Sequence, residues 1–214
     1  MNGLFITVEG PDGSGKSTQI ILLKEFLEQQ GIPHVVTREP GGTAISDRIR
    51  SLILDPAHQE MVDETEVLLY AASRAQHVKE KIMPALAEGK VVLCDRFVDA
   101  SIAYQAYGLG IPVEEVKAVN RFATGGLMPH RSYLIDIEPG DGRKRMMHRY
   151  AGESMDRIEQ KELDYHERVR AGFKSLYNEN EGRFCLVDGS QSVEAVFHTI
   201  EKDMKILLSN RYNT

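Results

Sequence analysis

Residues 8–18 read VEGPDGSGKST and contain the pattern G-x-x-x-x-G-K-[ST], which is typical of a phosphate-binding loop. An apolar run, Leu4–Val8, precedes this loop and is short enough to be a buried strand. Apolar residues between Ile20 and Leu27 recur at helical spacing, so we expect a helix that begins inside the motif. The stretch therefore predicts a strand, a loop and a helix that together bind a nucleoside triphosphate.

The residue types within the loop suit this chemistry. Gly10, Gly13 and Gly15 allow backbone N–H groups to turn inward around phosphate oxygens, and the helix N-terminus adds its dipole at the same place. We expect Lys16 to reach the β- and γ-phosphates and Ser17 to ligate Mg²⁺. The alternative is a chance match in a Gly-rich loop, and the flanking strand and helix argue against it.

Composition limits the classes of partner. The 214 residues include 26 basic and 32 acidic side chains, a net charge of −6, so no global field attracts nucleic acid or an anionic membrane. No stretch approaches the roughly 20 apolar residues of a membrane span. Cys94 and Cys185 are far apart and are not spaced for a metal or a disulfide framework, which suits a reducing compartment. We expect a single cytoplasmic domain, residues 1–214, without nucleic acid or membrane partners.

The remainder of the chain alternates between strand and helix patterns. Short apolar runs predict five strands, at 4–8, 34–38, 91–94, 131–137 and 183–187. Helical spacing recurs after the loop and near 45–55, 63–87, 113–124, 163–177 and 193–208. This alternation predicts an α/β fold with a five-stranded parallel sheet that is covered by helices on both faces.

Charged residues follow two of the predicted strands. Arg38 ends the second strand and Glu39 follows it, and Asp95 and Arg96 come after the third. In open α/β sheets, ligands bind at the carboxyl ends of the strands. An aspartate in the position of Asp95 is where enzymes with this loop place a carboxylate that organises Mg²⁺, and Arg96 beside it is suited to a phosphate.

Two further helical patterns carry residues that could line the same cleft. Tyr70 and Arg74 are four residues apart and so share a helix face. Core packing with a snorkelling cation is the more common fate of such a pair, and stacking on a nucleobase is the alternative. One of Arg48 and Arg50 could also point into the cleft, although a solvated face is more common.

A basic run follows the fourth strand. Residues 142–149 read GRKRMMHR and are followed by Gly152 and by DRIE at 156–159. A solvated helix face is one interpretation of this run. A short mobile segment between two helices is also the usual construction of a lid, and a cationic lid suits a polyphosphate. We therefore predict a lid at about 141–160.

The number of arginines points to a second anionic substrate. Arg38, Arg74 and Arg96 lie at or near strand ends, which is more than one triphosphate needs when Lys16 and the lid already serve it. A kinase presents a second pocket with cations for its acceptor, whereas a GTPase or motor presents a positioned water. An anionic acceptor such as a nucleoside monophosphate would use these arginines.

Six blocks together make the resemblance specific. The phosphate loop with FITVEG at 5–10, TREPGGT at 37–43, AASR at 71–74, VLCDRF at 92–97, SIAYQ at 101–105 and DRIE at 156–159 resemble the thymidylate kinase family in order and spacing. The likeness covers essentially the whole chain and is to bacterial members with an Arg-rich lid. It implies a nucleoside monophosphate kinase-like fold of the P-loop NTPase class. It also implies transfer of the γ-phosphoryl of ATP to dTMP in dTTP biosynthesis, with Mg²⁺ and without a covalent intermediate, in a homodimer.

The resemblance also assigns residues. ATP is expected to contact the whole loop: Gly10, Pro11, Asp12, Gly13, Ser14, Gly15, Lys16, Ser17 and Thr18. The residues expected to bind dTMP are Asp12, Arg38, Tyr70, Arg74, Arg96, Ser101, Tyr104 and Gln105. Within this set, Asp12 corresponds to the carboxylate near the 3′-hydroxyl, Tyr104 to the aromatic group against the sugar, and Tyr70 stands where the family more often has Phe stacked on thymine. Arg38 and Arg96 correspond to the acceptor-phosphate arginines. Ser17, Asp95 and Glu39 correspond to the residues that organise Mg²⁺.

The catalytic cation is left open among the lid arginines. The loop has no basic residue at 12–14, where some family members carry one, so the cation is expected from the lid. Arg149 is the first candidate, Arg157 the second and Arg145 the third, and Lys16, Arg96 and Asp12 complete the expected catalytic set.

Two alternatives for the function are a kinase of another nucleoside or nucleotide and a nucleotide-binding switch protein without transfer activity. The chain contains no Asn-Lys-x-Asp guanine motif, which argues against the switch protein.

Overall fold

A computed structural model describes residues 3–149 and 155–212. Its centre is a sheet of five parallel strands in the order β2-β3-β1-β4-β5. The strands are β1 (Leu4–Glu9), β2 (His34–Arg38), β3 (Val91–Asp95), β4 (Arg131–Asp136) and β5 (Phe184–Asp188). The predicted five-stranded parallel sheet is therefore confirmed, with strand ends that match or differ by one residue.

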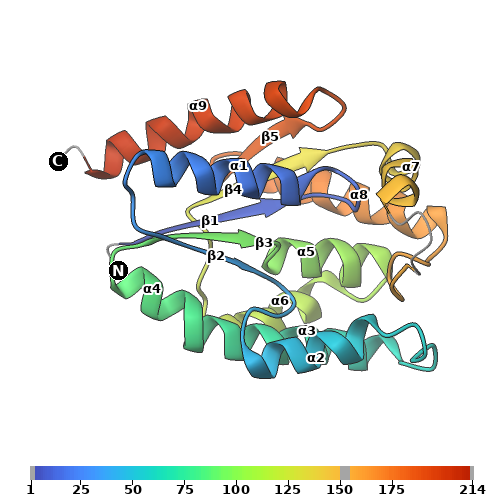
Figure 1. The fold of residues 1–214 in the computed structure, drawn as a ribbon. Coiled ribbons are helices and arrows are strands. Elements are labelled where there is room, and N and C mark those ends of the chain that lie inside the picture. Colours follow the sequence, from blue (N-terminus) through green and yellow to red (C-terminus); the bar gives the residue numbers. More distant parts are fainter. Residues whose placement is uncertain (1–2, 150–154, 213–214) are drawn as a thin grey trace.

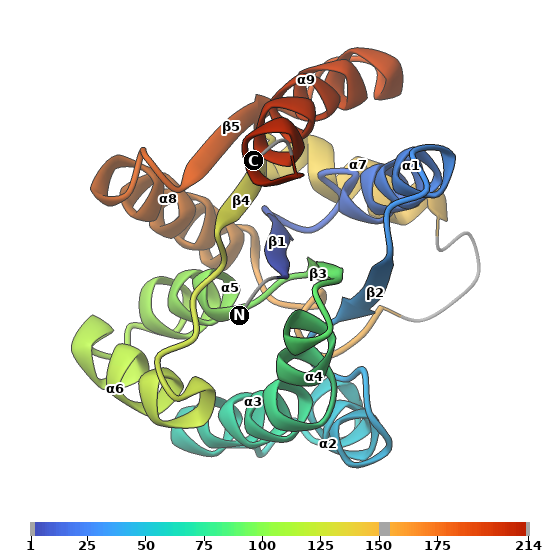
Figure 2. The same ribbon diagram turned by 90° about the vertical axis from the view of Figure 1, so that its left-hand side faces the viewer.

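Helices cover both faces of this sheet (Figures 1 and 2). One face carries α1 (Lys16–Gln29) and α9 (Val193–Tyr212), which pack against each other. The other carries α2 (Ala44–Leu54), α3 (Asp63–His77), α4 (Met83–Ala87), α5 (Val98–Ser101), α6 (Val113–Thr124) and α8 (Leu163–Glu179). The helix α7 (Pro139–Arg149) lies at the carboxyl ends of the strands, on the right in Figure 1.

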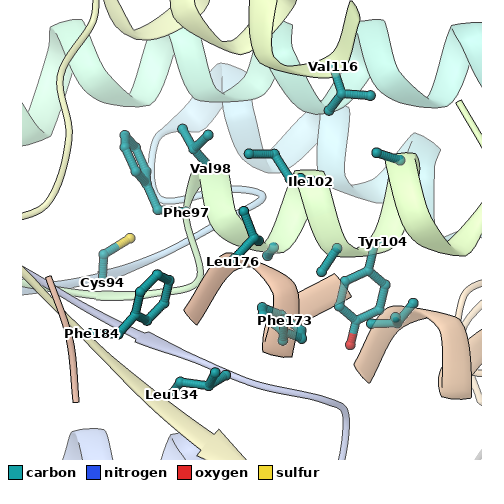
Figure 3. Close-up of a cluster of buried hydrophobic side chains, with 14 of the residues drawn as sticks. Cys94, Phe97, Val98, Ile102, Tyr104, Val116, Leu134, Phe173, Leu176 and Phe184 are labelled. Atoms are coloured by element: carbon teal, nitrogen blue, oxygen red, sulfur yellow. The ribbon is translucent and has the colours of Figure 1, made fainter. Parts of the chain in front are cut away.

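The alternation of side chains along β1 explains the two cores. Leu4, Ile6 and Val8 face α1 and α9, whereas Phe5 faces the opposite helices. Figure 3 shows part of this second core, where Phe97 and Phe173 lie near Phe184. β1 and β3, in the middle of the sheet, are buried on both faces, which is why their sequences read as nearly continuous apolar runs.

Two helical segments contain π-helical turns. The predicted helix at 63–87 is present as α3, the π-helix η1 (Val78–Ile82) and α4. The polar and aromatic segment after Asp95, which the sequence did not identify as helical, forms α5 and the π-helix η2 (Ile102–Gly108). The wider turn of η2 brings its side chains to the cavity described below, as π-helical turns often do at functional sites. No helix among the described residues is both long and apolar enough to cross a membrane.

Candidate active site

A cavity of about 760 Å³ lies at the carboxyl ends of the central strands. Its volume is in the range that holds a nucleotide-sized ligand. It brings together most of the residues that the sequence singled out: Asp12, Gly13, Gly15, Lys16, Ser17, Thr18, Arg38, Glu39, Tyr70, Arg74, Asp95, Arg96, Ser101, Tyr104, Gln105 and Arg145. Gly10, Pro11 and Ser14 belong to the same loop but do not line the cavity. Residues more than 100 positions apart in the sequence thus meet in one space.

The phosphate loop connects β1 to α1. Lys16 bends back over it, and its Nζ donates to the carbonyl oxygens of Gly10 at 3.1 Å and Pro11 at 2.8 Å. Burial, together with the nearby charge of Arg96, lowers the pKa of Lys16 to about 8. Both partners are neutral carbonyls, so no opposite charge holds the Lys16 ammonium in this position. It lies close to the place where phosphate oxygens are expected, and these would attract it more strongly.

Helix α7 begins directly against this loop. Gly13 has a φ of 75°, and a Cβ at this position would collide with the backbone carbonyl of Gly142 in α7. A Cβ on Gly142 would in turn meet the carbonyl of Asp12. Glycine is needed at both positions because the two backbones approach so closely.

Asp12, Arg96 and Tyr104 form a connected cluster. One guanidinium nitrogen of Arg96 lies 2.5 Å from Asp12 and 3.0 Å from the Tyr104 hydroxyl, which donates to the other Asp12 oxygen at 2.6 Å. A second Arg96 nitrogen donates to the Gly10 carbonyl at 2.9 Å. Burial would raise the pKa of Asp12, but Arg96 and Lys16 together lower it below its usual value. Arg96 has a φ of 68°, a strained backbone conformation that aims its side chain into the site.

Arg74 is a buried centre of hydrogen bonds on α3. It donates to Glu39 at 2.6 Å, to Ser101 at 2.8 Å, to the carbonyl of Phe97 at 3.1 Å and to Asn120. These contacts use four of its five N–H groups among the described residues. Arg74 is buried, as the core interpretation of this helix face expects, and it also lines the cavity, so its contact with a nucleobase stays a prediction.

Glu39 is occupied on both oxygens. One accepts from Arg74, and the other lies 2.8 Å from Nδ1 of His77. His77 is held from its other nitrogen by Thr37 at 2.7 Å. Glu39 is thus placed to orient Arg74, and its oxygens are less available to a metal than the sequence led us to expect.

The residues near Asp95 fit a bound Mg²⁺. Oδ1 of Asp95 is buried and has no hydrogen-bond partner among the described residues, and Ser17 lines the same cavity. Cα of Asp95 pairs in register with Val8 on one side and Arg38 on the other, so it stands between the loop strand and the predicted acceptor arginine. An oxygen that lacks a partner in a polar cavity is suited to a hard cation.

Glu9 and Arg50 were not among the predicted site residues. Glu9 ends β1, is fully buried, and neither carboxylate oxygen has a partner in the described chain. Burial, reinforced by Asp99, raises its pKa well above the usual value. The sequence signal that could have identified Glu9 is its position in residues 8–18, directly before the glycines of the phosphate loop.

Arg50 lines the cavity and donates to the Pro40 carbonyl at 3.0 Å. Of Arg48 and Arg50 on α2, it is therefore the one that faces the cleft.

The arginines of the predicted lid have different surroundings. Arg145 lines the cavity and donates to the Gly189 carbonyl at 2.9 Å. Arg143 is exposed, and Arg149 ends α7 with its side chain outside the described residues. Arg157 is buried, does not line the cavity, and donates to Glu66 at 2.6 Å and to the Ile53 carbonyl at 2.8 Å. Arg157 therefore holds the segment that leads into α8 against α2 and α3.

Comparison with known proteins gives a consistent result. Residues 8–200 match the family described as thymidylate kinase. A thymidylate kinase of Exiguobacterium sibiricum is 54% identical over 211 residues, which cover 99% of this chain and 98% of the relative. One of Bacillus licheniformis is 49% identical and covers 94% of each chain. The crystal structure of a thymidylate kinase from Ehrlichia chaffeensis superposes with a TM-score of 0.75 at 31% identity, covering 97% of this chain and 99% of that one. On these grounds, and on the arrangement of its site, the chain belongs to the thymidylate kinase family.

Proposed function

We infer that this chain transfers the γ-phosphoryl group of ATP to dTMP, giving ADP and dTDP for dTTP biosynthesis. The observation that carries this inference is the presence of two anion-binding sets in one cavity. Lys16 and the phosphate loop form one set, and Arg38 and Arg96 form the other. A direct transfer needs both substrates together, so that the acceptor oxygen stands in line with the γ-phosphorus.

At the donor end, the loop N–H groups and the α1 N-terminus hold the phosphates. Lys16 leaves the carbonyls of Gly10 and Pro11 for the β- and γ-phosphates, where its charge stabilises the transferring group. When bound, Mg²⁺ supplies further neutralisation of phosphate charge, and Ser17 and Asp95 would hold it. Glu39 contributes through its ion pair with Arg74.

At the acceptor end, each side chain has a separate task. Arg96 binds the dTMP phosphate, with Arg38 at the rim, while Asp12 faces the deoxyribose near its 3′-hydroxyl. Tyr104 lies where a ribose 2′-hydroxyl would crowd it. The ring of Tyr70 stacks on thymine. The fifth N–H of Arg74 faces the base edge together with Gln105 and Ser101. Burial raises the pKa of Tyr70, so its hydroxyl stays protonated.

Charge that develops on the transferring group needs a cation from the lid. Arg149 and Arg145 on α7 are the proposed sources, because Arg157 is already paired with Glu66. Closure over the phosphates also excludes water and so limits wasteful hydrolysis of ATP.

We also propose that the enzyme works as a homodimer. Ile45 on α2, Leu68 on α3 and Phe122 on α6 are exposed, the last to 92%, and α3 packs between the other two helices (Figure 2). Exposed apolar residues on three helices that pack side by side support an interface on this side of the molecule. Light scattering of the purified chain should give twice the monomer mass, and Phe122→Asp should halve it; a monomeric wild type would contradict this.

The test of the transfer reaction is ADP release that depends on dTMP, measured over a grid of both substrate concentrations. Intersecting initial-velocity lines are expected, since a ternary complex precedes transfer. Parallel lines, which indicate a covalent intermediate, or ADP release that is independent of dTMP would contradict the proposal.

We also propose that the reaction takes place in the cytoplasm. Cys94 and Cys185 are free thiols, in keeping with a reducing compartment.

A further inference from the structure

Glu66 connects the lid segment to the cavity. It lies on α3 and is 1% exposed, and each of its carboxylate oxygens has one partner. Oε1 accepts a hydrogen bond from Nε2 of Gln105 at 3.0 Å. Oε2 accepts one from the guanidinium of Arg157 at 2.6 Å. The three side chains thus form a buried row that ends at the cavity, which Gln105 lines.

The hydrogen bonds in this row have a fixed direction of donation. A carboxylate accepts hydrogen bonds and an arginine only donates them. The amide of Gln105 must therefore turn its NH₂ group toward Glu66. Its Oε1 is left buried, and this oxygen has no partner within the described chain. A ligand in the cavity consequently meets a hydrogen-bond acceptor at Gln105.

We propose that Glu66 is a positioning residue that selects the base by fixing the direction of the Gln105 amide. The inference rests on the proposed function and adds to it a source of specificity. Thymine carries a hydrogen on its ring nitrogen N3 and can donate to the Gln105 oxygen. Cytosine presents a lone pair at N3, which the same oxygen repels. A buried acceptor that stays unpaired weakens binding by about 10- to 100-fold.

The orientation of the Gln105 amide can be reversed by a substitution that keeps the size of the side chain at position 66. In Glu66→Gln, Arg157 still requires an oxygen, so the new amide at position 66 turns its NH₂ toward Gln105. The Gln105 amide must then rotate by half a turn and present its own NH₂ to the cavity. The site would then favour a base with an acceptor at N3.

The experiment compares kcat/KM for dTMP and for 5-methyl-dCMP, which keeps the methyl group and shape of thymine but has an acceptor at N3. We expect Glu66→Gln to lower the ratio of kcat/KM for dTMP to kcat/KM for 5-methyl-dCMP by about 10- to 100-fold. In the variant, the Gln105 NH₂ group would pair with the acceptor at N3 of 5-methylcytosine and no longer with the N–H of thymine. Glu64→Gln is the matched control: it makes the same change on an exposed face of α3 and should leave the ratio unchanged. Adding Gln105→Glu to Glu66→Gln restores an acceptor at the cavity and should restore the preference for dTMP.

A second variant covers the case in which Glu66→Gln does not fold. The pair Glu66→Met with Arg157→Met replaces a buried ion pair by apolar side chains, a change that proteins often tolerate. It frees the Gln105 amide to take either direction, so the ratio should again fall by about 10-fold. A ratio within a few-fold of wild type in whichever variants fold, with both substrates affected equally, would overturn the inference and leave Glu66 as an anchor for Arg157. A wild type without activity on dTMP would instead contradict the proposed function.

Discussion

The guanidinium of Arg96 lies 2.5 Å from the carboxylate of Asp12. Asp12 belongs to the phosphate loop, whereas Arg96 follows β3 and adopts a left-handed backbone conformation to reach it. The contact joins the loop proposed to bind the donor to the arginine proposed to bind the acceptor phosphate. Because the Tyr104 hydroxyl hydrogen-bonds to both side chains, the loop and the residue that follows β3 are held at a fixed spacing.

Replacement of Lys16 by Ala should lower kcat by about 10²-fold or more, since it removes a preorganised cation from the transferring group. The affinity for dTMP should change little, because Lys16 serves the donor. Steady-state kinetics and calorimetric titration with dTMP measure the two effects. Lys24→Ala, on an exposed part of the same helix, should behave as wild type. Near-normal turnover without Lys16 would refute its role.

The lowered pKa of Lys16 predicts an alkaline limb in the pH profile. The side chain is charged below its pKa of about 8 and loses its proton above it. If only the charged form binds ATP productively, kcat/KM for ATP should fall above pH 8, approaching tenfold per pH unit. The phosphates of bound ATP raise this pKa, so kcat should decline at a higher pH. A kcat/KM that stays flat to pH 10 would show that the neutral amine suffices.

Arg74→Ala should affect both stability and acceptor binding. The change leaves Glu39 buried without its arginine, and breaking a buried ion pair costs about 3–5 kcal/mol of unfolding free energy. It also removes the N–H proposed to face the base, so dTMP should bind more weakly while ATP affinity stays nearly constant. Denaturant unfolding and titration with each nucleotide measure these effects, and exposed Lys79→Ala serves as the control. Loss of stability with normal dTMP binding would reduce Arg74 to a core residue.

Arg149→Ala should lower kcat by roughly 10²- to 10⁴-fold, with smaller changes in either KM, as expected for a cation that acts mainly in the transition state. Arg143→Ala, an exposed position on the same helix, should be mild. Single-turnover measurements would separate transfer from product release. If kcat stays within a few-fold of wild type in Arg149→Ala, the catalytic cation should be sought at Arg145, Arg50 or Arg96.

The sequence predicted the parallel sheet because strand and helix patterns alternate, and because β1 and β3 are buried on both faces and read as nearly continuous apolar runs. It predicted the loop because glycines and Lys16 are needed at fixed spacing. The helical character of 101–108 was missed because polar and aromatic residues there follow no simple apolar period. The buried ion pair of Arg157 could not be predicted, since its partner Glu66 lies 91 positions away in the chain. The lack of a hydrogen-bond partner for the Glu9 carboxylate among the described residues likewise depends on burial in three dimensions.

The most direct test of the central claim is a coupled assay of ADP release with a panel of monophosphates that includes dTMP, UMP, CMP and dGMP. The account predicts that dTMP gives the highest kcat/KM, because Tyr104 disfavours ribose and the base contacts favour thymine. A higher kcat/KM for UMP, CMP or dGMP would indicate a kinase of another nucleotide. Absence of turnover with every monophosphate would contradict the account as a whole.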